Sequence, residues 1–137
     1  MTKIGLLRLS YWIGAIADLI VGIGMVYPRF LAYALRLEAP PLAIETRCAL
    51  GMGASLMFGW TALLLWADRK PLERSGVLVL TVAVIFGLAF TTLYGSLSGY
   101  IPLVGAVSVW IFQAFLIILF LSACSIATKE KFGPTKK

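Results

Sequence analysis

Residues 9–27 read LSYWIGAIADLIVGIGMVY, an apolar stretch with a single carboxylate, Asp18, at its midpoint. About 20 such residues are enough for a helix to cross the ~30 Å hydrocarbon core of a bilayer. A charged side chain at the centre of such a helix costs about 2.5–3.5 kcal/mol on insertion scales, so it is rarely present without a partner or a purpose. Asp18 is therefore the first candidate functional residue.

Three further apolar stretches follow, at about 48–67, 75–95 and 102–127. They are continuous and lack the two-residue alternation of membrane strands, so we expect helices. Hydrophobic residues make up 61% of the chain and charged residues 13%, whereas soluble domains carry about 25% charged residues. The sequence therefore predicts an all-α, polytopic membrane protein, with four transmembrane helices in a bundle that forms a single domain over residues 1–137.

The connection between the first two stretches is the longest, and residues 29–37 within it have the pattern of a short interfacial helix. Arg29 and Arg36 are seven residues apart and share one face, while Leu31 and Leu35 share another. Such a helix lies in the headgroup region with its apolar face toward the hydrocarbon. Two interpretations stay open, a connector that holds its arginines at the interface and a lid over a pocket.

The basic residues are distributed unequally between the two sides of the membrane. Nine of the twelve lie in the N-terminal segment, the turn between spans two and three, and the C-terminal tail, and three lie on the other side. Cytoplasmic loops carry the excess of Lys and Arg, so both termini are expected in the cytoplasm, with the protein in the cell inner (plasma) membrane. Anionic lipid headgroups are the expected partners of Arg69, Lys70, Arg74, Lys129 and Lys131. Nucleic acid is not expected as a partner, because no continuous basic surface is available.

Asp18 is flanked one turn away on each side by Gly14 and Gly22, so this face should point into the bundle. Gln113 in the fourth span is the long polar side chain at similar depth, and Ser55 in the second span is the next candidate partner. We expect an uncharged Asp18 that is hydrogen-bonded to Gln113, because hydrocarbon disfavours a charge. A site for a proton or a cation and a purely structural hydrogen bond both remain open.

Small residues also form stripes in the next two spans, and we expect these to pack inward in a tight bundle. The stripes are Gly51, Ser55 and Gly59 in span two, and Ala83, Gly87, Thr91 and Gly95 in span three. Cys48 and Cys124 lie near opposite membrane faces, too far apart for a disulfide, and each is expected as a small buried residue.

The residue types that most enzymes need are missing from the spans. The chain has no histidine, the commonest general base and a frequent metal ligand. No second carboxylate lies within a span, and Ser55 and Ser108 have no base beside them. We therefore expect no enzyme activity, no metal site and no cofactor.

The layout resembles small four-span inner-membrane proteins of bacteria, including DoxX-like and related families. The resemblance rests on a glycine-rich first span with Gly14, Gly22 and Gly24, on the exit Tyr27-Pro28, and on the basic turn RKPLER at 69–74. The acid in the first span also resembles that of small multidrug-resistance transporters. That second resemblance implies a shared proton and drug site at Asp18, although this chain has aspartate instead of the family's glutamate and a longer first external connection.

Two functional hypotheses follow. The one that we favour is a non-enzymatic helical bundle with an accessory, assembly or lipid-interacting role, alone, as a homodimer or with a partner membrane subunit. The alternative is a dimeric, proton-coupled transporter or binder of small hydrophobic cations that uses Asp18.

Overall fold

The computed structural model describes residues 3–34, 43–99 and 101–132, and these form a helical bundle. Its elements are α1 (Lys3–Val26), α2 (Pro28–Ala34), α3 (Ile44–Asp68), α4 (Gly76–Leu97) and α5 (Leu103–Phe132). Among the described residues, α1, α3, α4 and α5 are long and apolar enough to cross a membrane. The predicted fold class, an all-α polytopic membrane protein, is confirmed.

The helices extend beyond the apolar stretches that the sequence marks. α1 begins at Lys3 and α3 at Ile44, several residues before the expected positions 9 and 48. Hydropathy marks the part of a helix that suits hydrocarbon, whereas good helix formers such as Leu, Arg and Glu continue the hydrogen-bonded turns outside it. The short helix expected at 29–37 begins at Pro28, where proline suits the first turn. Its predicted positions 35–37 lie outside the described residues.

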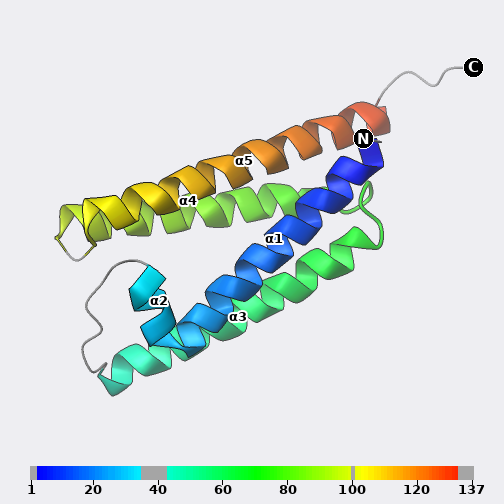
Figure 1. The fold of residues 1–137 in the computed structure, drawn as a ribbon. Coiled ribbons are helices and arrows are strands. Elements are labelled where there is room, and N and C mark those ends of the chain that lie inside the picture. The colour runs from blue at the N-terminus through cyan, green and yellow to red at the C-terminus, as the bar shows by residue number, and fades with distance from the viewer. Residues whose placement is uncertain (1–2, 35–42, 100, 133–137) are drawn as a thin grey trace, which may run out of the picture.

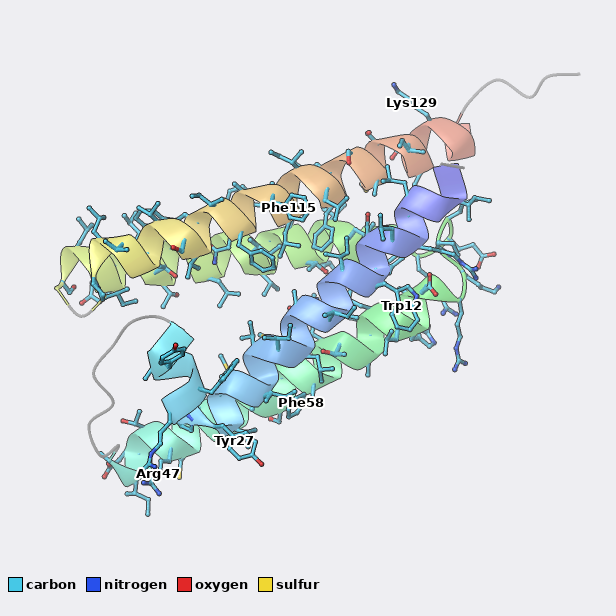
Figure 2. The ribbon with its side chains drawn as sticks, viewed as in Figure 1. Trp12, Tyr27, Arg47, Phe58, Phe115 and Lys129 are labelled. Carbon is cyan, nitrogen blue, oxygen red and sulfur yellow. The ribbon has the colours of Figure 1, made fainter. Side chains whose placement is uncertain are left out.

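The long helices form two antiparallel pairs, α1 with α3 and α4 with α5 (Figure 1). The pairs are close together at the end that carries Lys3 and Phe132, which we call the terminal end, and they diverge toward α2. Arg47 and Tyr27 lie at this α2 end, while Lys129 lies at the terminal end (Figure 2). α1 contacts α2, α3 and α5, so it connects the two pairs.

The turn between α4 and α5 depends on one glycine. Gly99 has a φ of +76°, the left-handed conformation that commonly ends a helix. The Ser98 amide donates to the Tyr94 carbonyl at 2.9 Å, and the Ile101 amide donates to the Gly95 carbonyl at 3.1 Å. These bonds satisfy carbonyls at the end of α4, and the chain reverses directly into α5.

The core lies where α1 meets both of its long neighbours. At Gly14 a Cβ atom would come within 3.0 Å of Phe120 Cζ on α5 and 3.2 Å of Leu64 Cδ1 on α3. Phe120 and Leu64 are fully buried, so neither ring nor methyl group can easily move aside. Glycine is needed here because three helices approach one another closely.

The expectation that the small-residue stripes pack inward is wrong for most of their members. Gly51, Ser55 and Gly59 are exposed on α3, as are Ala83, Gly87 and Thr91 on α4, and of the two stripes only Gly95 is buried. A Cβ on Gly51, Gly59 or Gly87 would meet no described atom within 4 Å outside its own helix. In lipid the outside of a bundle is as apolar as its inside, so small apolar residues do not identify the inner face.

The expectation that both cysteines are buried is also wrong. Cys48 is exposed on α3, and Cys124 is partly buried, with its Sγ 3.8 Å from the Ser75 carbonyl oxygen.

We predict that Gly14→Val destabilises the protein by about 1–3 kcal/mol, the usual cost of overpacking. The matched control is Gly87→Val, which adds the same side chain in a helix where space is open, and it should change stability by less than about 0.5 kcal/mol. Thermal unfolding in detergent, followed by circular dichroism, measures both variants. Equal losses would contradict the packing described at Gly14.

Candidate functional site

Asp18 lies on α1 one turn beyond Gly14 and is partly buried. Its Oδ2 atom is enclosed by the protein and has no hydrogen-bond partner among the described residues. The position follows from helix periodicity, since Tyr11, Gly14 and Asp18 repeat at intervals of three and four residues on the side that faces the core. An enclosed carboxylate oxygen without a donor is costly, and such a group calls for an explanation.

Gln113 lies on the inner face of α5, seven residues before Phe120 and therefore on the same side of the helix. The side chain is only 8% exposed, which makes it one of the few buried polar groups of the bundle. Its Oε1 atom is likewise enclosed and has no partner in the described part of the chain. The amide thus adds a second enclosed acceptor to the membrane core.

The contact between Gly14 and Phe120 sets the register of α1 against α5. Because these helices are antiparallel, moving four residues along α1 to Asp18 corresponds to moving back along α5 toward Gln113. With a rise of 1.5 Å per residue, the two side chains lie within about one helical turn, ~5 Å, along the axis. The structure records no hydrogen bond between them, so the expected direct bond is absent; α1 and α5 diverge toward the α2 end (Figure 1).

Ser55, the other predicted partner of Asp18, forms no hydrogen bond with Asp18 or Gln113. Its hydroxyl donates to the Met52 carbonyl of its own helix at 2.8 Å, and the residue is exposed. The polar side chain that α3 turns toward α1 is instead Thr61, whose hydroxyl donates to the Met57 carbonyl at 2.9 Å and lies 3.5 Å from the Ala15 carbonyl oxygen. The sequence carries no signal that distinguishes these two hydroxyl residues.

A second polar link that the sequence reasoning missed joins α3 to α4. The indole Nε1 of Trp60 donates to the Thr81 hydroxyl at 3.1 Å. Thr81 is 3% exposed and itself donates to the Val77 carbonyl. The bond ties the two helix pairs together, so Trp60 has a structural role in the bundle.

The turn at 69–75, at the terminal end, holds several of the predicted headgroup contacts. Arg74 lies over the Trp66 ring, with its guanidinium carbon 3.3 Å from the ring centroid, and donates to the Trp66 carbonyl. Lys70 pairs with Glu73 at 3.0 Å. Arg69 and Lys129 are exposed, and the side chain of Lys131 lies outside the described part of the structure. Two of the predicted cations therefore already have partners within the chain.

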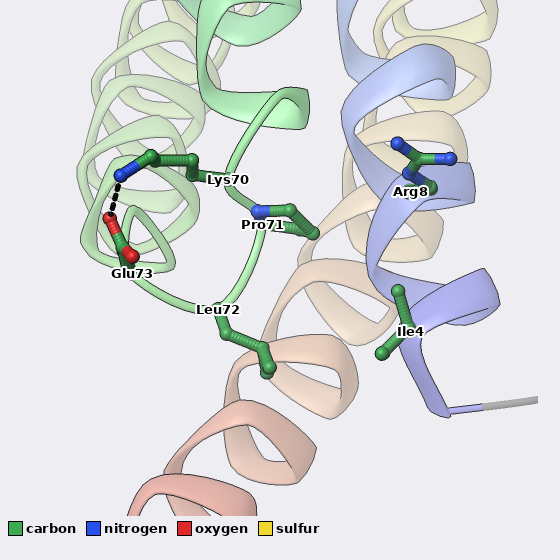
Figure 3. Close-up of a pocket in the computed structure, with 6 residues that line it drawn as sticks. All are labelled: Ile4, Arg8, Lys70, Pro71, Leu72 and Glu73. Carbon is green, nitrogen blue, oxygen red and sulfur yellow. Dashed lines mark hydrogen bonds and ion pairs between the residues drawn. The ribbon is translucent and has the colours of Figure 1, made fainter.

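A shallow hollow of about 270 Å³ lies beside this turn (Figure 3). It is lined by Ile4 and Arg8 from α1 and by residues 70–73, and Lys70 and Glu73 pair at its rim. Arg8 Nε is 3.6 Å from Asp68 Oδ1. The hollow thus combines apolar walls with cations that are already neutralised.

Tyr11 fixes α1 to the same turn. The side chain is fully buried, and its hydroxyl lies 3.0 Å from the Arg74 carbonyl oxygen and 3.3 Å from that of Pro71. A phenol of this kind pairs an apolar ring with a polar tip, which suits the boundary between hydrocarbon and headgroups. The end of the bundle where the helix pairs meet is therefore held by a hydrogen bond as well as by packing.

No protein-family model matches the chain, and a significant match is found neither among curated proteins nor among solved structures. The resemblances to DoxX-like proteins and to small multidrug-resistance transporters therefore remain predictions. The function has to be argued from the geometry of the bundle itself.

Tyr11→Phe is expected to lower the free energy of unfolding by about 1 kcal/mol, because it removes a hydrogen bond that the carbonyls of Arg74 and Pro71 accept from the buried Tyr11 side chain. Tyr27→Phe is the matched control, since Tyr27 is 66% exposed and its hydroxyl should matter little. Denaturant titration in detergent compares the two variants. A Tyr11→Phe protein as stable as the control would show that the hydroxyl does not hold the turn.

Proposed function

We propose that this protein is a non-enzymatic integral membrane protein that acts as a subunit of a membrane assembly, and that its first partner is a second copy of itself. The observation that carries this proposal is the uncovered face of α3. Of the four long helices, α3 is the least enclosed by the rest of the chain. Its buried residues are Ala54, Thr61, Leu64 and Ala67.

The uncovered side of α3 carries Cys48, Gly51, Ser55 and Gly59, which we call the α3 small-residue face. Intervals of three and four residues put them on one side of the helix. Gly59 and Thr61 are two residues apart, about 200° around the helix axis, so this face points away from α1. Small residues let two helix backbones approach closely, and close packing is the main attraction between helices in lipid.

A second copy fits this face better than an unrelated helix for a reason of symmetry. Two copies inserted in the same orientation present parallel α3 helices, related by a two-fold axis along the membrane normal. Most homo-oligomers use such closed symmetry, in which each surface meets its own counterpart. Glycines then face glycines, and Cys48 of one copy faces Cys48 of the other.

The rest of the molecule supports a non-enzymatic role in the cytoplasmic membrane. Among the described polar side chains of the core, Tyr11, Trp60, Thr61 and Thr81 are already used in hydrogen bonds. The basic residues at the terminal end would face anionic headgroups of the cytoplasmic leaflet, as the excess of Lys and Arg there predicts.

Mild oxidation of membranes that contain the protein is expected to give a disulfide-linked dimer, at twice the 14.9 kDa mass of the chain. The two Cys48 Cα atoms must come within about 7 Å for this to happen. Cys48→Ser should abolish the dimer and Cys124→Ser should leave it. Gly59→Leu should reduce its yield several-fold because the side chain separates the helices, whereas Gly87→Leu, a matched change on α4, should not. Absence of the dimer while Cys48 still reacts with a maleimide would refute the proposal.

The orientation has its own test, because Cys48 lies toward the α2 end and Cys124 toward the terminal end. A membrane-impermeant maleimide is expected to label Cys48 in intact cells whose outer membrane has been permeabilised, and Cys48→Ser should lose this label. Labelling of Cys48 only after the inner membrane is opened would place the termini outside the cytoplasm.

A further inference from the structure

Two enclosed oxygen atoms in the membrane core have no hydrogen-bond donor. Within the described residues these are Asp18 Oδ2 and Gln113 Oε1. A third enclosed oxygen, Asp68 Oδ1, differs because Arg8 Nε lies 3.6 Å away and supplies a positive charge. By helix periodicity, Asp18 shares the side of α1 that carries Gly14, and Gln113 shares the side of α5 that carries Phe120. Gly14 and Phe120 are in contact, so we infer that the two oxygens lie near the same gap between α1 and α5. One shared donor would satisfy both.

The neighbouring side chains do not supply this donor. The Thr61 hydroxyl donates to the Met57 carbonyl, and the Trp60 indole donates to Thr81. The charged and titratable groups on α1 and on the helices packed against it lie toward the helix ends, and the nearest on α1, Tyr11, is seven residues and about 10 Å from Asp18. Among the side chains that the structure describes, these groups are Arg8, Tyr11, Tyr27, Arg29, Tyr33, Glu45, Arg47, Cys48, Asp68, Cys124 and Lys129.

The packing on either side of Asp18 limits the size of a ligand. A Cβ on Gly14 would come within 3.0 Å of Phe120 Cζ, and one on Gly22 within 2.7 Å of Phe58 Cε1. Aromatic rings therefore already fill the space one turn before and one turn after the carboxyl group. A proton adds a donor without adding volume, whereas a metal ion needs several further oxygen ligands.

We propose that Asp18 and Gln113 form a proton-binding site, in which the Asp18 carboxyl holds the proton and donates a hydrogen bond to one water molecule, which in turn donates to Gln113 Oε1. The proton removes the charge from the carboxylate and gives both acceptors a hydrogen bond. Gln113 is then a positioning residue, since it orients the carboxyl group and does not itself bind the proton. This inference is independent of the proposed assembly through α3.

Infrared spectroscopy of the protein in lipid bilayers at neutral pH tests the site, because a protonated carboxyl group has a C=O band that an ionised one lacks. The chain has only two aspartates, Asp18 and Asp68, so carboxyl-¹³C aspartate labelling assigns the band without any mutation. We expect a protonated aspartate band that is lost in Asp18→Asn and kept in Asp68→Asn. Gln113→Leu should shift this band, because the water molecule that accepts from the carboxyl group loses its own acceptor.

Three results would overturn the proposal. A wild-type spectrum without a protonated aspartate band would mean that Asp18 is ionised and accepts from another donor, such as the Gln113 amide group turned around. A band that survives in Asp18→Asn would belong to another residue. A band that keeps its wild-type frequency in Gln113→Leu would mean that Gln113 does not take part in the hydrogen bonding of the Asp18 carboxyl group. The label-based assignment on the unmodified chain decides the first result even if a variant fails to fold.

Discussion

The close contact of α1 with α3 and α5 at Gly14 is the interaction on which the rest of the bundle depends. Lipid tails solvate apolar side chains as well as a protein core does, so burial alone gives helices little reason to associate. Dispersion contacts at short range must supply the attraction. The missing side chain at Gly14 lets Phe120 and Leu64 reach the α1 backbone from two sides. At this position the α1–α3 pair packs directly against α5.

The number of membrane helices could be predicted from the sequence because hydrocarbon imposes a length and a polarity on each span. The side of each helix that packs inward could not be predicted in the same way. Gly14 and Gly59 have the same chemistry, yet one lies in the core and the other on the outside. In water the outer face would carry charges, but in lipid both faces are apolar, so the pattern that separates them in soluble proteins is missing.

The long polar side chains Asp18 and Gln113 predicted the inner faces of their helices better than the small residues did. They did not predict which groups form hydrogen bonds. Gln113 is buried, and Asp18 faces the core, because a polar group in a span is placed away from lipid. Their direct hydrogen bond was not found, since it depends on how far α1 and α5 diverge. That angle results from all contacts of the two helix pairs, including the Trp60–Thr81 bond, and no local pattern encodes it.

The unequal lengths of α4 and α5 have a consequence for how the protein sits in a bilayer. α4 has 22 residues and α5 has 30, which correspond to about 33 Å and 45 Å at 1.5 Å per residue. A short turn joins them at one end, so α5 extends past α4 by about 12 Å at the other. A hydrocarbon layer of ~30 Å is already spanned by α4, and a thicker membrane would draw more of α5 into the lipid. The last turns of α5, which extend past α4, are therefore the part of this helix whose depth in the bilayer would change most with membrane thickness.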